Sequence, residues 1–276
     1  MKYLKLLFFI SIIGSLLAAC SSSSSNKEIN KNQAKDSSSV LNIYTTIYTL
    51  QDFTEKIGGD HVKVSNIVPT GSDAHSFEPT AKTMIKISEG SAFIYMGTGI
   101  EGFSDAVVDA VGEEKVKIVK AGEGIKLIDS LNSEDDHEGK NGENEEDHQE
   151  EQGNKDPHVW IDPIRSIQLA ENIKNALVNL KPEAKKEFEK NYSTLKEKLE
   201  NLDLKFKKMV KEEPKNKFIV SHAAYGYWAY RYNLNQIGIS GLSPTDEPSQ
   251  KELQEIIEIA KVIYPIFSLN RTPITM

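Results

Sequence analysis

Three of the six histidines lie in loops or at strand ends, which is where an α/β protein builds its ligand sites. His75 follows a strand-like run in the sequence GSDAHSFEP, His158 lies in DPHVW, and His222 ends the apolar run FIVSH. Any one of them alone is typical of a buried, hydrogen-bonded histidine. Three neutral imidazoles together suit a borderline ion such as Zn²⁺, which takes three or four N, O or S ligands. The sequence therefore predicts a metal site at these three residues.

The residue types leave the chemistry of this site open. A carboxylate or a water would complete a tetrahedron, and three ligands with a water would also suit a His₃ zinc hydrolase. The histidines come from distant segments rather than from an HExxH helix, and no serine or glutamate stands in an evident general-base motif. The spacing therefore leaves binding and hydrolysis open, and the lack of an evident general-base motif favours a binding protein over an enzyme. A surface adhesin or scaffold with structural histidines is a third possibility. His61, beside Asp60, is predicted to be a solvated surface residue.

An acidic segment precedes the DPHVW motif and carries two further histidines, His137 and His148. Between residues 133 and 151 there are ten acidic residues and one lysine, a net charge of −9 in a chain whose total is −8. This composition cannot form a packed core, so a disordered loop is predicted at 132–155. The loop is either a solvated insert or an accessory collector of metal cations. The remainder of the chain is nearly neutral, which argues against nucleic acid as a partner.

The N-terminus has the features of a bacterial lipoprotein signal. Lys2 and Lys5 precede a largely apolar stretch that is too short to span a bilayer, and the stretch ends in LAAC at Cys20. This is the only cysteine, so it cannot form an intrachain disulfide. We expect residues 1–19 to be a signal peptide, Cys20 to be lipidated, and the serine-rich residues 20–39 to be a flexible tether. The protein would then be anchored at the extracytoplasmic face of the bacterial cell membrane.

Short apolar runs alternate with amphipathic ones after the tether. The alternation predicts a parallel sheet with crossover helices, that is, an N-terminal α/β lobe over residues 40–180. The expected strands lie at 40–46, 62–68, 92–96 and 116–119, and the expected helices at 48–57, 79–88 and 102–111.

A long helix is predicted next, with a linking segment at 181–213. Its apolar residues are spaced by four and three and form a narrow seam: Phe188, Tyr192, Leu195, Leu199, Leu202, Phe206 and Met209. The seam suits either one helix laid across two domains or a coiled-coil contact. Beyond it, a strand at 217–221, a helix at 224–232 and a helix capped by Ser249 and Glu252 predict a partial C-terminal α/β lobe at 214–276. One strand and two helices are too few for a complete lobe.

Several motifs together resemble the metal-binding lipoproteins of zinc and manganese ABC transporters. They are the lipobox, SDAHSFEP, DPHVWIDP, FIVSHAAYGY and GLSPTDEPS, in that order along the chain. The resemblance implies two doubly wound α/β lobes joined by one long rigid helix, with the metal in the interlobe cleft. It places metal ligands on His75, His158 and His222. A histidine at the third position and an acidic, histidine-containing insert are typical of zinc-type members.

The resemblance also implies a role in transport. The partners that it implies are the permease and ATPase of an ABC importer, to which a monomeric protein delivers Zn²⁺, with Mn²⁺ less favoured. The alternative is a manganese-type lipoprotein or adhesin of the same fold. Similarity to the family ends near residue 261, whereas family members continue and supply a fourth, carboxylate ligand from their second domain. The sequence is therefore expected to be a C-terminally truncated form.

Overall fold

The computed structural model describes residues 40–112, 116–130, 155–213 and 215–262, all within one compact unit that spans residues 38–276. The predicted signal peptide, Cys20 and its tether lie outside the described residues. The same holds for His137 and His148 of the acidic segment and for the chain after residue 262. Within the described ranges, no helix is long and apolar enough to cross a membrane.

The larger of two sheets has four strands, all parallel, in the order β2-β1-β3-β4. The strands are β1 (Leu41–Thr45), β2 (Val62–Asn66), β3 (Ala92–Tyr95) and β4 (Lys117–Lys120). The first three lie within the apolar runs that predicted them, and β4 is shifted by one residue from the run predicted at 116–119. Because β1 is central and the chain leaves it toward both edges, the carboxyl ends of β1 and β3 meet at the point where ligands bind in such sheets.

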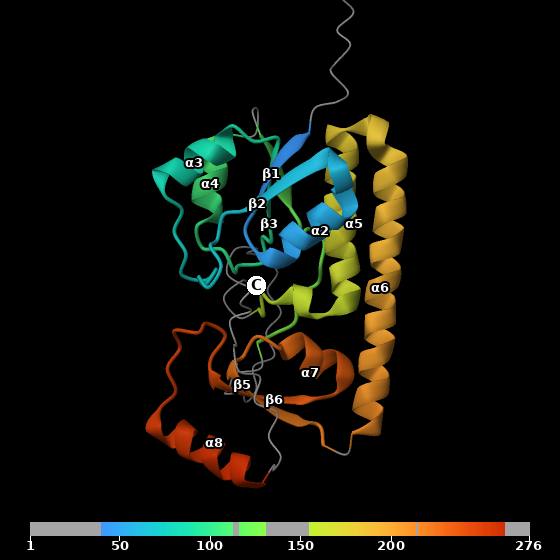
Figure 1. The fold of residues 1–276 in the computed structure, drawn as a ribbon. Coiled ribbons are helices and arrows are strands. Elements are labelled where there is room, and N and C mark those ends of the chain that lie inside the picture. Colours follow the sequence, from blue (N-terminus) through green and yellow to red (C-terminus); the bar gives the residue numbers. More distant parts are fainter. Residues whose placement is uncertain (1–39, 113–115, 131–154, 214, 263–276) are drawn as a thin grey trace, which may run out of the picture. The chain divides into compact units, whose positions relative to one another are not determined.

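Helices cover both faces of this sheet (Figure 1). On one face lie α2 (Tyr48–Gly58), α5 (Pro163–Leu180) and α6 (Lys185–Glu212), and on the other lie α3 (Ala81–Ser88) and α4 (Ser104–Val111). The side chains of β3 alternate between two apolar cores, one on each face of the sheet. Ala92 and Ile94 belong to the core beneath α2 and α5, whereas Phe93 belongs to the core beneath α3 and α4. The predicted α/β fold class is confirmed.

Helix α5 was not predicted, although the sequence marks its start. The side chain of Asp162 accepts a hydrogen bond from the backbone N–H of Ile164 at 2.8 Å, and Pro163 occupies the first helical position. An aspartate N-cap followed by proline is a typical helix start. The apolar residues Leu169, Ile173 and Leu177 then repeat every four residues and are fully buried.

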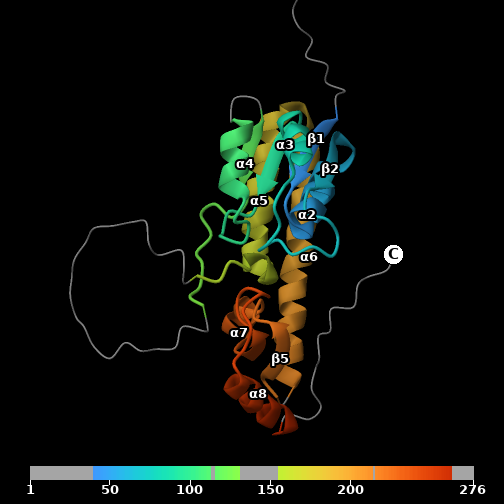
Figure 2. The same ribbon diagram turned by 90° about the vertical axis from the view of Figure 1, so that its left-hand side faces the viewer.

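Helix α6 contacts the helices of both sheets. It begins after a short 3-10 helix at Pro182–Ala184, and its buried residues Phe188, Leu195 and Leu199 belong to the core shared with α2 and α5. Further along, Phe206 stacks on Tyr232 of α7 with ring centroids 5.3 Å apart. Most of the apolar seam thus packs within the chain, although Leu202 and Met209 are exposed, and this packing favours the spanning helix over the coiled-coil interpretation (Figure 2).

The smaller sheet pairs β5 (Lys217–His222) with β6 (Asn235–Ser240), in parallel, through the crossover helix α7 (Gly226–Tyr232). The sequence predicted only one strand here, and that prediction is wrong. Strand β6 reads NQIGIS and lacks a continuous apolar run, so it depends on pairing with β5.

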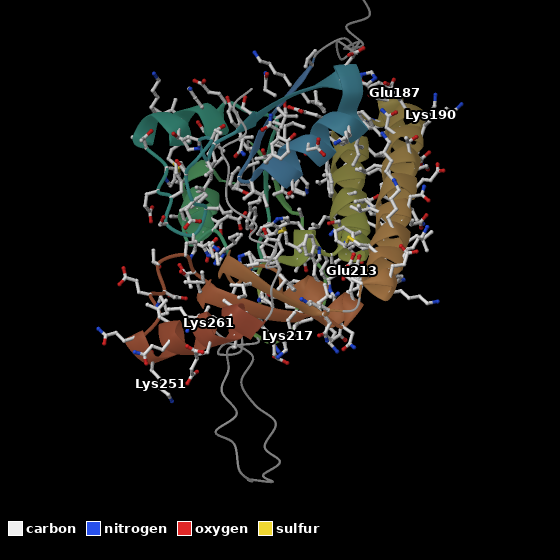
Figure 3. The ribbon with its side chains drawn as sticks, turned by 60° about the horizontal axis from the view of Figure 1, so that its bottom comes forward. Glu187, Lys190, Glu213, Lys217, Lys251 and Lys261 are labelled. Atoms are coloured by element: carbon white, nitrogen blue, oxygen red, sulfur yellow. The ribbon has the colours of Figure 1, made fainter. Side chains whose placement is uncertain are left out.

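Helix α8 (Gln250–Val262) follows and begins with the predicted capping box. The N–H of Ser249 donates to Glu252 Oε2, and the N–H of Glu252 donates to Ser249 Oγ. The outer surfaces of α6 and α8 carry exposed charged side chains, such as Lys190 and Lys251 (Figure 3).

Candidate metal centre

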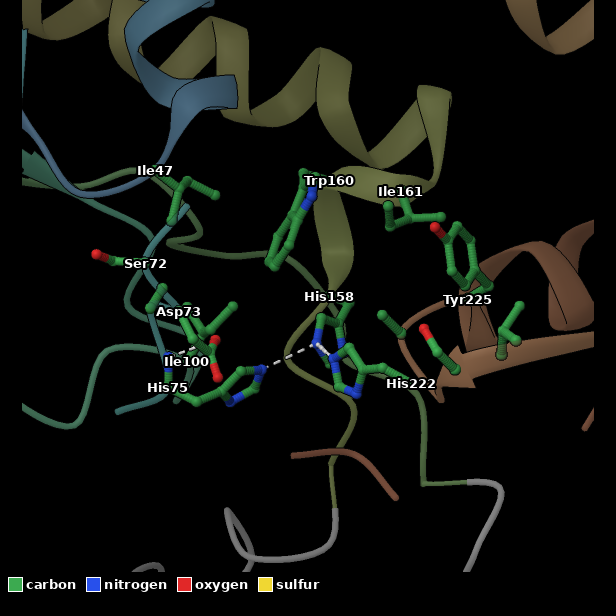
Figure 4. A pocket seen from close by; sticks show the side chains of 14 residues that line it. Ile47, Ser72, Asp73, His75, Ile100, His158, Trp160, Ile161, His222 and Tyr225 are labelled. Carbon is green, nitrogen blue, oxygen red and sulfur yellow. Dashed lines mark hydrogen bonds between the residues drawn. The ribbon is translucent and has the colours of Figure 1, made fainter. Parts of the chain in front are cut away.

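The imidazole rings of His75, His158 and His222 converge on one another (Figure 4). Nε2 of His75 and Nε2 of His222 each lie 3.2 Å from Nε2 of His158. One nitrogen from each ring lies within 4.8 Å of the others. In the part of the chain that the structure describes, no other group of three or more His, Cys, Asp or Glu side chains has this geometry.

Each histidine is held by a different element. His75 lies in the loop between β2 and α3, where its backbone N–H donates to Asp73 Oδ1 at 3.2 Å. His158 immediately precedes the 3-10 helix η3 (Val159–Ile161), and His222 is the last residue of β5. The larger sheet and the segment before α5 therefore supply two rings, and the smaller sheet supplies the third.

A buried carboxylate orients His158. Nδ1 of His158 lies 2.8 Å from Asp156 Oδ1, and the backbone N–H of His158 donates to the same oxygen at 2.9 Å. Both residues are about 1% exposed. An ionised carboxylate only accepts, so Nδ1 carries the ring proton and Nε2 presents its lone pair. Metal-ligating histidines are commonly oriented by such a carboxylate partner.

The other two rings favour the neutral form. Burial lowers the pKa of both His75 and His222, and the neighbouring His158 ring lowers the pKa of each further. Nδ1 of His222 lies 3.0 Å from the carbonyl oxygen of Gly241, which assigns the ring proton to Nδ1 and leaves Nε2 as the lone-pair donor. Both rings are thus available to a metal ion beside the lone pair of His158 Nε2.

The three rings line a cavity of about 310 Å³. Its apolar wall includes Ile47, Ile100 and Trp160, whose ring centroid lies 5.3 Å from that of His158. Imidazole ligands suit Zn²⁺ better than a hard ion that prefers oxygen ligands. The donor set therefore fits Zn²⁺.

His61 does not join the centre, and its side chain is 28% exposed. Its Nε2 lies 3.0 Å from Glu187 Oε2, and its ring meets Phe188 edge-to-face with centroids 5.5 Å apart, so the predicted surface residue also makes a tertiary contact. This contact joins the start of β2 to α6. No sequence motif marks it, because the two partners are 126 residues apart.

Sequence reasoning missed three residues around the histidines. Asp156 was visible only as part of the DPHVW motif. Tyr227 donates through its hydroxyl to the carbonyl oxygen of Asp156 at 2.8 Å, and Glu101 is 3% exposed beside the cavity residue Ile100. The signal that could have revealed Glu101 is an acidic residue directly after a strand and two glycines, Gly97 and Gly99.

Residues 43–262 match the family described as zinc-uptake complex component A, periplasmic (ZnuA). The chain belongs to this family. The family is one of zinc-uptake components and not of enzymes, in agreement with the sequence-based prediction and with the recognised resemblance. The chain is 35% identical over 274 residues to the zinc-binding lipoprotein AdcA of Streptococcus pneumoniae, covering 98% of this chain and 51% of AdcA.

Two further comparisons agree. The chain is 33% identical to the high-affinity zinc uptake system protein ZnuA of Bacillus subtilis, covering 92% of this chain and 76% of that protein. The Zn(II)-bound ZnuA-like domain of Streptococcus pneumoniae AdcA superposes with a TM-score of 0.65 and 34% identity, covering 81% of this chain and 75% of that one. The chain thus spans about half the length of the AdcA relatives that it matches.

Proposed function

We propose that this protein captures Zn²⁺ outside the cytoplasm through His75, His158 and His222 and delivers it to the permease and ATPase of an ABC importer. The observation that carries the proposal is the convergence of three Nε2 atoms, with His75 and His222 each 3.2 Å from His158. The names of the AdcA and ZnuA relatives, which describe zinc binding and zinc uptake, support the choice of metal.

The domain organisation that we propose follows from where the ligands originate. An N-terminal lobe at 40–180 supplies His75 and His158, a linking helix at 181–213 spans the molecule, and a C-terminal part at 214–276 supplies His222. Zn²⁺ would then bind between the two parts as transported cargo. In the same proposal, Cys20 carries the lipid anchor, the protein acts as a monomer, and His137 and His148 belong to an accessory collecting loop.

Zinc titration of the purified 276-residue protein tests the ligand set. Alanine substitution of His75, His158 or His222 should each lower the affinity by more than the roughly 10–100-fold typical of losing an outer-shell partner. His61→Ala is the matched control, because it also removes a partly buried imidazole, and its zinc affinity should equal that of the parent. Unchanged zinc affinity in all three ligand variants would show that the ligand assignment is wrong.

A further inference from the structure

We propose that Glu101 is a positioning residue for the metal centre, acting through Thr98 on the backbone that carries His158. The inference rests on the proposed function, because it concerns the ligand geometry of the same site. Glu101 is 3% exposed and belongs to the loop that follows β3. A carboxylate buried to this extent requires hydrogen-bond donors. The segments that supply these donors are the ones that Glu101 holds in position.

Three donors surround the Glu101 carboxylate, and they lie just after the ends of two neighbouring strands. Oε1 accepts from the hydroxyl of Thr46 at 2.5 Å and from the backbone N–H of Met96 at 2.7 Å, while Oε2 accepts from the backbone N–H of Gly97 at 3.2 Å. Thr46 directly follows β1, and Met96 directly follows β3. Glu101 therefore fastens the loop to the ends of the two strands beneath the metal centre.

The fastened loop reaches the metal centre through Thr98. The Thr98 hydroxyl donates to the carbonyl oxygen of Pro157 at 2.8 Å, in the peptide group that leads into His158. Asp156 holds the same stretch from its other side, through the ring and backbone nitrogens of His158. The His158 backbone is thus fixed by two carboxylates: directly by Asp156, and through Thr98 by Glu101.

Close packing restricts the movement of the loop that carries Thr98. Gly97 has a φ of +71°, and a Cβ atom there would lie 2.3 Å from Lys120 Cγ. A Cβ atom on Gly122 would lie 2.7 Å from Cγ2 of Thr98, so the Thr98 methyl group packs directly on that glycine. This close packing allows the Glu101 hydrogen bonds to set the position of Thr98.

Two test substitutions, at Thr98 and Glu101, and a control for each separate the two steps of this proposal. Thr98→Val keeps the methyl group and replaces the hydroxyl that donates to Pro157 with a second methyl, whereas Thr98→Ser keeps the hydroxyl. Glu101→Gln keeps the size, but its amide must set an N–H donor against the N–H of Gly97 or against the donors at Oε1. Glu78→Gln, on the exposed part of the His75 loop, removes the same charge without touching these hydrogen bonds.

The experiment measures zinc affinity, thermal unfolding of the metal-free protein, and the visible absorption of the Co²⁺-loaded protein, which reports ligand geometry. Thr98→Val should weaken zinc binding about 3- to 10-fold, an effect of the size of one lost hydrogen bond, and alter the Co²⁺ spectrum. Glu101→Gln should do both more strongly, and Glu78→Gln should match the parent. Thr98→Ser keeps the hydroxyl but loses the methyl group that packs on Gly122, so it should bind zinc more tightly than Thr98→Val.

A lower melting temperature with unchanged affinity and unchanged Co²⁺ spectrum in both Thr98→Val and Glu101→Gln would overturn the inference, because it would show a purely structural role. His158→Ala, measured alongside, distinguishes this outcome from a failure of the proposed function. If His158→Ala also retained tight zinc binding, the ligand assignment itself would be wrong.

Discussion

Nδ1 of His158 lies 2.8 Å from Oδ1 of Asp156, and both side chains are almost completely buried. This contact fixes the tautomer that exposes Nε2, and the adjacent negative charge makes that nitrogen a stronger base and a better metal ligand. The second oxygen of Asp156, Oδ2, has no hydrogen-bond partner among the described residues. Burial of the unpaired Oδ2 has a desolvation cost, and the hydrogen bonds of the other oxygen go to His158.

The first prediction concerns the charge of this carboxylate. Asp156→Asn keeps the shape of the side chain but removes the charge, so Nε2 of His158 becomes less basic. Zinc affinity should fall roughly 10- to 100-fold, measured by competition with a chelating indicator. Asp109→Asn, at an exposed position on α4, is the charge-matched control and should bind zinc like the parent. Equal affinities in the two variants would contradict the role assigned to Asp156.

The second prediction concerns the tight contact between α7 and Asp156. A Cβ atom on Gly226 would lie 2.3 Å from Asp156 Oδ2, so Gly226→Ala must displace either the carboxylate or the start of α7. The free energy of unfolding of the metal-free protein should fall by about 1–3 kcal/mol, as for other overpacked sites, and zinc affinity should fall as well.

Gly102→Ala provides the comparison for this experiment. No atom lies within 4 Å of a Cβ built on Gly102, which is exposed. Its free energy of unfolding should stay within about 0.5 kcal/mol of the parent. Urea denaturation measures both variants. If Gly226→Ala proved as stable as Gly102→Ala, α7 would have more freedom at this contact than the structure indicates.

The sequence predicted the three histidines because each follows a strand or lies in a loop, where parallel sheets place ligand side chains. It could not show that the rings meet, because His75 lies in a loop after a strand of the larger sheet and His222 ends a strand of the smaller one. Glu101 could not be predicted for a different reason. Its partners at Met96 and Gly97 are backbone N–H groups, which no residue pattern marks.

The fold was predictable wherever local signals agree with the tertiary structure. The strands of the larger sheet are apolar runs, and Ser249 and Glu252 form the predicted capping box. Strand β6 was missed because its two isoleucines, Ile237 and Ile239, stand among polar and glycine residues. Its strand conformation comes from register pairing with β5, a contact that only the folded chain supplies.

The third prediction concerns pH and the contact between α6 and α7. Asp203 is 4% exposed and accepts hydrogen bonds from Arg231 Nε at 2.6 Å and from the Tyr232 hydroxyl at 3.1 Å, and Lys207 Nζ lies 2.8 Å from it. Burial alone would raise the pKa of this carboxyl, but the hydrogen bonds from Arg231 and Lys207 outweigh it and lower the pKa to about 2.

Because the pKa of Asp203 is lower in the folded than in the unfolded protein, its contribution is fully present above the unfolded value of 3.8 and is lost as the pH falls toward 2. The contribution is roughly 2 kcal/mol. Asp203→Asn should therefore lower the free energy of unfolding at pH 7, and the difference from the parent should shrink between pH 4 and pH 2. Urea denaturation at several pH values measures this, with the exposed Glu197→Gln as control. A difference that stayed constant across this range would refute the linkage.

The last prediction concerns the acidic segment before the metal centre. Asp129 and Lys155 form an antiparallel bridge, with Lys155 Nζ 2.6 Å from Asp129 Oδ1, and the N–H of Asp156 donates to the carbonyl oxygen of Ile128 at 3.0 Å. The chain therefore enters and leaves the segment at adjacent positions. A short Gly-Ser linker in place of residues 132–154 can close this gap, and it lowers the entropic cost of loop closure.

The shortened protein should keep the melting temperature and the tight zinc affinity of the parent, because none of the three proposed ligands is removed. If the segment collects cations, the zinc association rate at low ionic strength should fall in the shortened protein. The double variant His137→Ala, His148→Ala then separates the imidazoles from the carboxylates. An unchanged rate in both variants would identify the segment as a solvated insert, and loss of tight binding in a folded, shortened protein would assign ligands to the segment itself.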